Sequence, residues 1–199
     1  MSTDVVWQEW NIPRLRREQQ NGHHAAVIWM TGLPGAGKTT IARAVERQLF
    51  ECGCRTMLLD GDQLRHGLCG DLAFSPTDRA ENIRRVGEVA RLFFEQGCIV
   101  LCAFVSPYRQ DREGARALLP EGRFLEVFVN ASVEECRRRD PKGLYNRVAT
   151  GRIGQFTGVS APYEEPIAAE LVLDTERQSV QESATAVIDA LKSRGILSL

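Results

Sequence analysis

The sequence has no apolar run long enough to cross a membrane, and it does not open on a basic segment followed by an apolar one. Residues 1–11 instead carry Asp4, Glu9 and two tryptophans. An excess of positive charge is also missing, because 26 Asp and Glu offset 25 Lys and Arg. Binding to nucleic acid or to an anionic membrane needs a basic surface. We therefore expect a cytoplasmic protein that acts on a small molecule, with neither nucleic acid nor a membrane as partner.

Disulfide and metal-binding patterns are missing as well. Of the six cysteines, Cys52 and Cys54 are separated by one residue, which is the wrong spacing for a C-x-x-C redox or zinc pair. Cys98 and Cys102 belong to an apolar run and are expected to be reduced, mostly buried thiols. Two of the three histidines are adjacent and the third is alone, so they give no metal-ligand spacing.

What the sequence does contain is a phosphate-binding motif. Residues 32–39 read Gly-Leu-Pro-Gly-Ala-Gly-Lys-Thr and fit G-x-x-x-x-G-K-[ST]. The apolar run at 25–31 predicts a buried strand before the motif, and apolar residues at helical spacing follow it. Such a loop directs backbone N–H groups at phosphate oxygens, beside the positive end of a helix. Lys38 then offers a cation to the β- and γ-phosphates, and Thr39 offers a hydroxyl to Mg²⁺.

Five short aliphatic runs predict strands at 27–31, 56–60, 99–105, 124–130 and 171–174. These runs are apolar on both faces, which indicates a parallel sheet covered by helices on both sides. Helix starts are marked by Ser75-Pro76 and by the capping boxes Ser132-x-x-Glu135 and Ser179-x-x-Glu182. The sequence therefore predicts one α/β domain of the P-loop NTPase type, doubly wound around a mainly parallel five-stranded sheet.

Two stretches do not fit this alternation. Residues 1–24 are polar, so we expect an arm that folds over the domain or over a partner, with the P-loop kinase domain at 25–199. Residues 140–166 combine glycines, prolines and cations without a sustained period. They predict a long functional loop, a mobile lid that excludes water from the site, and not a regular element. An inert surface excursion is the alternative.

Polar residues are expected at the carboxyl edge of the sheet, where open α/β folds bind ligands. At the end of the second strand, one carboxylate of Asp60-Gly-Asp62 would accept a proton from an attacking hydroxyl or hold Mg²⁺ through water. After the third strand, Ser106 would contact substrate, accept a phosphoryl group or simply cap the next helix. Arg139 and Lys142 would reach a phosphate if the lid closed.

Cations also gather after the second strand, at Arg65, Arg79, Arg84 and Arg85, together with Asn82. Solvated helix charges are the usual explanation of such a cluster. A second anionic substrate is the other, because guanidinium groups match phosphate and sulfate oxygens in pairs. Two aromatic residues, Phe74 and Phe156, would either sandwich a purine or belong to the core.

Taken together, these residues resemble the adenylyl-sulfate kinase (APS kinase) family. The resemblance is carried by seven segments in order: 32–39, 59–68, 71–75, 78–85, 104–109, 139–145, and 156–158 with 162–164. Val6-Trp7 and Asn21-Gly-His23 extend it into the arm. Two positions depart from the family: Pro34 stands where a serine is usual, and Ala73 stands where a glycine is common. Because variable positions of the loop act mainly through the backbone, we expect Pro34 to alter affinity at most.

The resemblance implies transfer of the ATP γ-phosphate to the 3′-hydroxyl of adenosine 5′-phosphosulfate (APS), with Mg²⁺ and usually by a homodimer. Lys38, Asp62 and Ser106 would be catalytic, with Asp62 at the 3′-hydroxyl and Thr39 on the metal. Ser106 matches the family's proposed phosphoserine position, and we favour direct in-line transfer. The residues implied for ATP are Gly32, Leu33, Pro34, Gly35, Ala36, Gly37, Lys38, Thr39, Thr40 and Arg139. Those implied for APS are Asp62, Arg65, Phe74, Arg79, Asn82, Val105, Ser106, Lys142 and Phe156.

Two other functions remain open on the residues alone. One is a different small-molecule P-loop kinase, which would share the phosphate loop and the lid. The other is a non-catalytic nucleotide-binding module, which the presence of both Lys38 and Asp62 disfavours.

Overall fold

The computed structural model describes residues 10–197, and within them five parallel strands form one sheet in the order β2-β3-β1-β4-β5. The strands are β1 (Ala26–Thr31), β2 (Thr56–Asp60), β3 (Ile99–Ala103), β4 (Phe124–Asn130) and β5 (Leu171–Asp174). Their positions confirm the five predicted strands. The third is shorter than expected, because the chain leaves the sheet after Ala103 and Ser106 adopts a φ of +38°.

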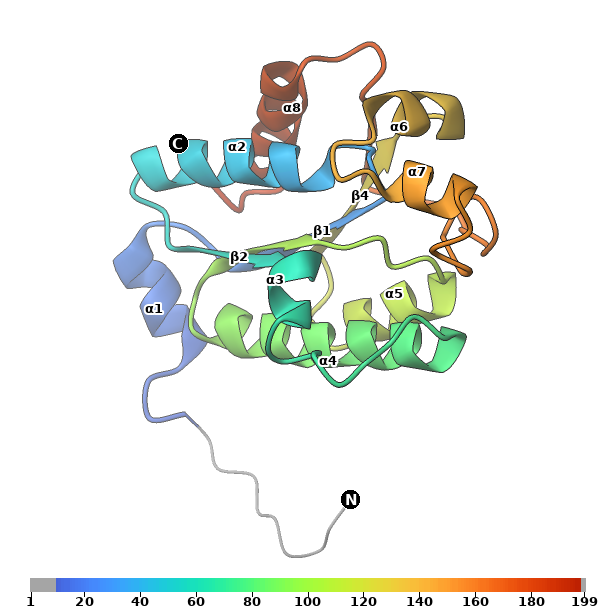
Figure 1. The fold of residues 1–199 in the computed structure, drawn as a ribbon. Helices are drawn as coiled ribbons and strands as arrows, with labels where there is room; N and C mark the ends of the chain where they lie inside the picture. Colours follow the sequence, from blue (N-terminus) through green and yellow to red (C-terminus); the bar gives the residue numbers. More distant parts are fainter. Residues whose placement is uncertain (1–9, 198–199) are drawn as a thin grey trace, which may run out of the picture.

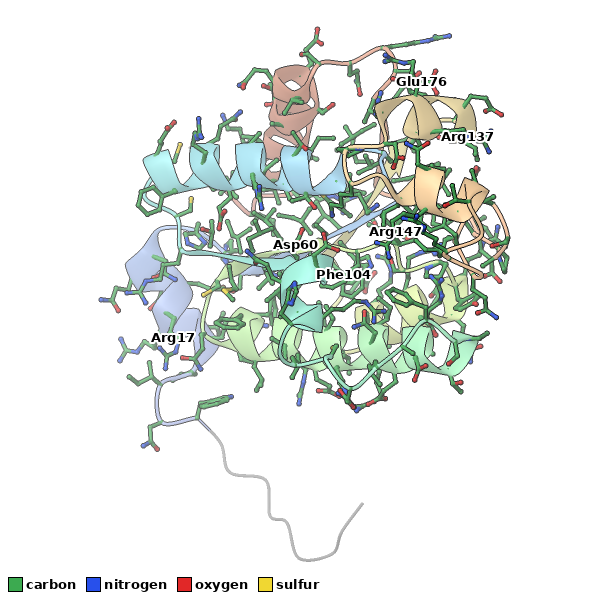
Figure 2. The ribbon with its side chains drawn as sticks, viewed as in Figure 1. Arg17, Asp60, Phe104, Arg137, Arg147 and Glu176 are labelled. Atoms are coloured by element: carbon green, nitrogen blue, oxygen red, sulfur yellow. The ribbon has the colours of Figure 1, made fainter. Side chains whose placement is uncertain are left out.

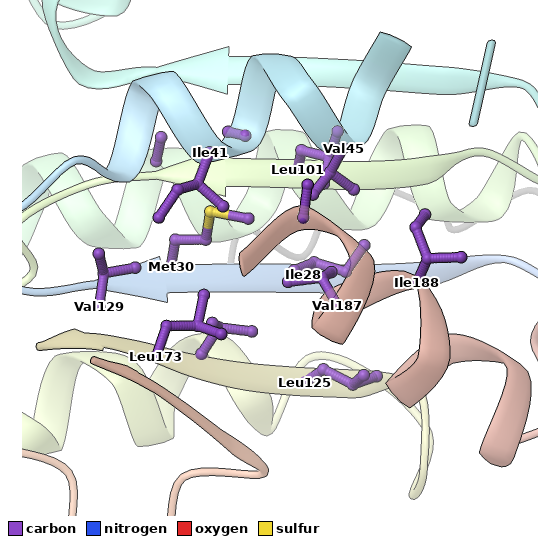
Figure 3. Packing of buried hydrophobic residues seen from close by; sticks show 14 of the residues in the cluster. Ile28, Met30, Ile41, Val45, Leu101, Leu125, Val129, Leu173, Val187 and Ile188 are labelled. Atoms are coloured by element: carbon purple, nitrogen blue, oxygen red, sulfur yellow. The ribbon is translucent and has the colours of Figure 1, made fainter. Parts of the chain in front are cut away.

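Side chains of the central strand alternate between two cores, one on each face of the sheet. Ile28 and Met30 pack with α2 (Lys38–Glu51) and α8 (Val180–Ser193), as Figure 3 shows. Val27 and Trp29 pack on the opposite face, beneath α4 (Pro76–Glu95) and α5 (Arg109–Arg116). Figure 1 shows these two helix layers on either side of the strands. This layering confirms the predicted doubly wound fold and exposes only the ends of the strands to ligands.

The remaining helices are short: α1 (Arg14–Asn21), α3 (Gly61–Arg65), α6 (Val133–Arg139) and α7 (Leu144–Ala149). Among residues 10–197, no helix is both long and apolar enough to cross a membrane. The 20-residue helix α4 begins at the predicted Ser75-Pro76, where the Ser75 hydroxyl accepts a hydrogen bond from the Asp78 N–H.

The prediction of no regular element in residues 140–166 is wrong, because α7 lies inside that segment. Its six residues are too few to show a hydrophobic period. Gly143, with a φ of +63°, precedes the helix, and the carboxylate of Asp140 accepts hydrogen bonds from the Tyr145 and Asn146 N–H groups, both at 3.1 Å. The side chain of Asp140 therefore caps α7, although Asp140 stands three residues before Gly143, which occupies the usual N-cap position.

Two predicted helix caps also differ from the structure. Ser106 does not cap α5, which begins after Tyr108; the Arg109 N–H donates instead to the Glu164 carboxylate at 2.9 Å. Ser132 accepts from the Glu135 N–H, but the Glu135 carboxylate binds Arg138 and Arg139 instead of closing the capping box. The box at Ser179 and Glu182 is complete.

The described part of the predicted arm, residues 10–24, lies against the domain itself. Asn21 Nδ2 donates to the Gly97 carbonyl at 3.0 Å, and the buried Glu18 carboxylate accepts from the Ala25 N–H at 3.0 Å. The Arg55 N–H donates to His23 Nε2, also at 3.0 Å. These bonds give Asn21-Gly-His23 a structural role. The Val6-Trp7 part of the resemblance lies outside the described residues.

Candidate active site

A cavity of about 1050 Å³ opens at the carboxyl ends of β1, β2 and β3. The phosphate loop forms one end of it and α3 and α4 the other, and residues 139–157, here called the covering segment, line much of the remaining wall. Figure 2 labels Asp60 and Phe104 in the sheet region beside this cavity, and Arg147 on α7. The site thus lies where the strand pattern predicts it.

The carbonyls of the phosphate loop are held by donors outside the loop or at its end. Lys38 Nζ donates to the carbonyls of Gly32 and Leu33, both at 2.9 Å. The Tyr145 hydroxyl donates to the Pro34 carbonyl at 2.9 Å, and the Thr175 hydroxyl to the Ala36 carbonyl at 3.0 Å. In a planar trans peptide, the N–H points opposite to the carbonyl. Fixing the Pro34 and Ala36 carbonyls therefore directs the N–H groups of the following glycines away from these donors.

Two glycines of the loop are required by its geometry. Gly32 has a φ of +150°, and a Cβ there would lie 2.3 Å from the Val129 carbonyl oxygen. Gly35 has a φ of +87°, and its Cβ would lie 3.0 Å from the Cys136 carbonyl oxygen. The loop is pressed between β4 and α6, so only residues without a side chain fit at these two positions.

Lys38 is buried, and this burial lowers the pKa of its ammonium group to about 8. Loss of hydration disfavours the charged form, and the nearby Asp60 and Asp62 carboxylates only partly offset that loss. At neutral pH the group remains mostly protonated. It is a poorly hydrated cation that gains from contact with an anion.

The two carboxylates at the end of β2 have different surroundings. Asp60 is buried, accepts from the Thr39 hydroxyl at 2.6 Å and accepts from the Asp62 N–H at 3.0 Å. Asp62 has a side chain that is 62% exposed, lines the cavity and forms an ion pair with Lys142. A hydroxyl beside a buried carboxylate is an oxygen donor set of the kind Mg²⁺ prefers. The implied site residues left Asp60 out, although the Asp-Gly-Asp pattern includes it.

The far end of the cavity holds an arginine pair around an aromatic ring. The guanidinium groups of Arg65 and Arg79 lie 4.3 and 5.8 Å from the centroid of the Phe74 ring, which is 56% exposed. Partial burial lowers the pKa of both arginines. Asn82 is buried, and its Nδ2 has no hydrogen-bond partner among residues 10–197. Cations, an aromatic face and a free amide donor therefore converge on one place.

Not every cation of the predicted cluster reaches the cavity. Arg84 pairs with Glu81, and Arg85 pairs with Glu81 and Asp71 on the outer face of α4. Neither lines the cavity. The solvated-charge explanation is therefore right for Arg84, whose side chain is 62% exposed. Arg85 is largely buried and has a structural role, because it also donates to the Leu68 carbonyl at 2.9 Å. Arg65, Arg79 and Asn82 face the cavity.

Ser106 is a buried residue in a strained backbone conformation. Its φ of +38° is unfavourable for a residue with a side chain. The Ser106 hydroxyl accepts from Trp29 Nε1 at 3.1 Å, and its carbonyl accepts from Arg112 at 2.7 Å. The preceding Val105 carbonyl accepts from the Thr31 hydroxyl at 2.7 Å. These contacts hold the loop after β3 at the cavity wall, where both Val105 and Ser106 line it.

The phosphate-loop end of the cavity continues toward the turn between β5 and α8. Arg139 donates to the Thr175 carbonyl at 2.7 Å and lies 3.4 Å from the Ala36 carbonyl. Beyond it, Gln178 Oε1 and the hydroxyl of the fully buried Ser183 line the cavity without hydrogen-bond partners among the described residues. These polar atoms are available to a ligand that extends past the loop. Sequence patterns did not indicate either residue.

Phe156 is buried and, like Lys142, belongs to the segment that covers the cavity. Gly32 and Leu33 are the predicted ATP-site residues that do not line the cavity, while residues 34–40 and Arg139 do. All nine residues implied for APS line it. The structure thus brings nearly the whole predicted set together around one space.

The central strand of a doubly wound parallel sheet leads into a Gly-x-x-x-x-Gly-Lys-Thr loop, and an anion-compatible pocket faces that loop across the cavity. This combination defines a P-loop kinase of small molecules. The family model described as "Adenylylsulphate kinase" matches residues 24–174. The chain belongs to this family, so the predicted family is confirmed.

Named relatives agree with this assignment. An adenylyl-sulfate kinase of Acaryochloris marina is 51% identical over 196 residues, covering 98% of this chain and 96% of the relative. One from Staphylococcus epidermidis is 49% identical over 191 residues, covering 96% of each. Among solved structures, the APS kinase of Mycobacterium tuberculosis in complex with AMPPNP and APS is 44% identical with a TM-score of 0.82, covering 85% of this chain and 99% of that one.

Proposed function

We propose that this protein transfers the γ-phosphoryl group of ATP to the 3′-hydroxyl of APS, the reaction of the family to which it belongs. The observation that carries the proposal is the single cavity, which joins the phosphate loop to the Arg65, Arg79 and Phe74 pocket with Asp62 on its wall. A phosphate donor and a second anionic purine nucleotide would therefore face each other across one space.

The donor would bind with its phosphates in the loop and its base toward the β5–α8 turn. Gly35 and Gly37 N–H groups would meet phosphate oxygens, and Lys38 would follow the β- and γ-phosphates. The unpartnered Gln178 Oε1 and Ser183 hydroxyl support the placement of the base. Thr39 and Asp60 would hold Mg²⁺, which when bound neutralises phosphate charge.

The acceptor would bind with its purine beside Phe74 and Phe156 and its anionic groups near Arg65, Arg79 and Asn82. Asp62 would accept the proton of the 3′-hydroxyl as that oxygen bonds to the γ-phosphorus and the bond from the γ-phosphorus to the bridging oxygen of ADP breaks. Lys142, paired with Asp62, would offset charge on the transferring group. The Ser106 hydroxyl, held by Trp29, would contact the acceptor without forming a covalent intermediate.

The remaining parts of the proposal concern the setting of the enzyme. We infer a homodimer that works in the cytoplasm, with residues 1–24 as an arm and residues 140–166 as a lid. The sequence composition and the family resemblance support these inferences.

The test is a coupled assay of ADP release with APS, AMP, shikimate or gluconate as acceptor. We expect strong preference for APS, together with formation of the 3′-phosphorylated product. A lack of preference for APS would reject the proposal in favour of another small-molecule kinase. Tight binding of both nucleotides without any turnover would instead indicate a non-catalytic module.

A further inference from the structure

We propose that Tyr145 links the two halves of this site, so that binding of the phosphate donor and binding of the acceptor strengthen each other. The inference rests on the proposed two-substrate function. It assigns to Tyr145 a positioning role: its hydroxyl fixes a peptide of the phosphate loop, and its ring supports Phe156 on the acceptor side.

At the site of the phosphate donor, Tyr145 holds the peptide group between Pro34 and Gly35. Its hydroxyl donates to the Pro34 carbonyl across 111 residues of sequence, at 2.9 Å. The proline ring locks the Pro34 φ, and the planar peptide then fixes the direction of the Gly35 N–H. The other described donors to these carbonyls come from Lys38, Thr175 and Arg139. Among the described donors to carbonyls of the phosphate loop, Tyr145 is therefore the one that comes from α7, in the covering segment.

On the acceptor side, the ring of Tyr145 makes an edge contact with Phe156, with centroids 4.9 Å apart and planes at 80°. The next residue, Thr157, accepts a hydrogen bond from Arg79 at 2.7 Å. Arg79 in turn lies over Phe74. A continuous chain of contacts thus runs from Pro34 through Tyr145, Phe156 and Thr157 to the arginine pocket.

The link is stiff enough to transmit a displacement. Tyr145 is only 5% exposed, and its backbone N–H is held by the Asp140 carboxylate at 3.1 Å. Burial raises the pKa of its hydroxyl, so the group keeps its proton and can donate at neutral pH. A change that moves Phe156 over an acceptor must therefore move or strain the bond to the phosphate loop. By linkage, a nucleotide that fixes the loop must favour the same position of Phe156.

The test is the variant Tyr145→Phe, which keeps the buried ring and removes only the hydroxyl. The affinity of APS is measured by calorimetry with and without ADP, and the ratio of the two dissociation constants is the coupling factor. We expect ADP to tighten APS binding to the wild type, and the coupling factor to fall about fivefold or more in the variant. The affinities for each ligand alone should change much less.

The matched control is Tyr163→Phe, which removes the hydroxyl of a half-buried tyrosine that also belongs to residues 140–166. That hydroxyl contacts Thr31 at 3.0 Å and no carbonyl of the phosphate loop, so the coupling factor should stay at the wild-type value. As a second variant, Phe156→Leu breaks the chain from the other end and should also lower the coupling factor, while weakening APS binding itself. Equal unfolding temperatures would show that the variants remain folded.

A coupling factor in Tyr145→Phe equal to that of the wild type would overturn the inference and leave the proposed function intact. Absence of any coupling in the wild type would overturn it as well. Failure of the wild type to bind APS at all would remove the proposed function, and the inference with it.

Discussion

At the scale of single residues, chemically identical groups differ because their surroundings differ. Asp60 is buried against Thr39, whereas Asp62, two residues later, is largely exposed and paired with Lys142. Burial lowers the pKa of Lys38, which lies at the phosphate loop. The residue scale is therefore where catalytic roles can be separated by single substitutions.

The lowered pKa of Lys38 predicts how donor affinity depends on pH. Below about pH 8 the ammonium group is protonated and attracts the phosphates; as the pH rises through 8 the free enzyme loses that charge. We expect the dissociation constant of ADP to be flat from pH 6.5 to 7.5 and to rise about tenfold per pH unit well above 8. Fluorescent-nucleotide titrations measure it, and Lys38→Ala should bind weakly with a flat profile over the same range.

Substitution of Asp60 and substitution of Asp62 are predicted to have different effects on catalysis. Asp62→Asn should lower kcat by about 10²- to 10⁴-fold with little change in ADP affinity, because it removes a proton acceptor. Asp60→Asn should instead raise the Mg²⁺ concentration needed for half-maximal rate. Steady-state kinetics at several Mg²⁺ concentrations separate the two effects. Asp71→Asn, an exposed carboxylate paired with Arg85, is the control and should behave as wild type. Wild-type turnover in Asp62→Asn would remove that residue from the mechanism.

At the scale of elements, short helices carry the parts of the site that local periodicity does not reveal. Helix α7 has six residues and is started by Asp140, whose carboxylate accepts two backbone N–H groups. Helix α3 has five residues and is capped by Asp60, whose side chain accepts from the Asp62 N–H. Both lie at the cavity. Their stability comes from caps and tertiary contacts, because helices this short are not stable alone.

The Asp140 cap predicts a local effect on α7. In Asp140→Ala the two N–H groups lose their acceptors, which should cost about 0.5–2 kcal/mol of local stability. Hydrogen exchange of residues 144–149 should become faster, and KM for both substrates should rise because Tyr145 and Phe156 lose support. Ser132→Ala removes the cap of α6 and serves as control; faster exchange there should leave α7 unaffected. Unchanged exchange at α7 in Asp140→Ala would contradict the role of this cap.

At the scale of the whole molecule, one of the groups that tie the described part of the arm to the domain is the buried carboxylate of Glu18. Burial alone would raise the pKa of Glu18, but hydrogen bonds from His24 and the Ala25 N–H, with Arg123 and Arg14 nearby, outweigh it and lower the pKa. The stability that this group contributes is complete above its ordinary pKa of 4.5 and is lost as the pH falls through the lower folded value.

Removing that charge should therefore destabilise the whole domain. Glu18→Gln should lower the free energy of unfolding by about 1–3 kcal/mol at pH 7, and the difference from wild type should shrink in acid. Urea denaturation at pH 7 and pH 4 measures both values. Glu95→Gln is the matched control, since Glu95 is more exposed and meets Arg14 only at 3.8 Å. An equal loss in both variants would argue against a special role for Glu18.

The local pattern of the sequence was sufficient to predict the five strands, the phosphate loop, the start of α4 and the family. Hydrophobic spacing, glycine positions and caps act over only a few residues, so they can be recognised without the fold. Only the tertiary structure decided that Arg79 faces the cavity while Arg84 and Arg85 face away, that Asp60 meets Thr39, and that the Tyr145 hydroxyl reaches the Pro34 carbonyl. These contacts join residues far apart in the chain, and they depend on how the layers pack. A local sequence pattern does not specify which side chains are buried or how far apart distant residues lie. These features of the site are therefore determined only when the carboxyl edge of the sheet is assembled.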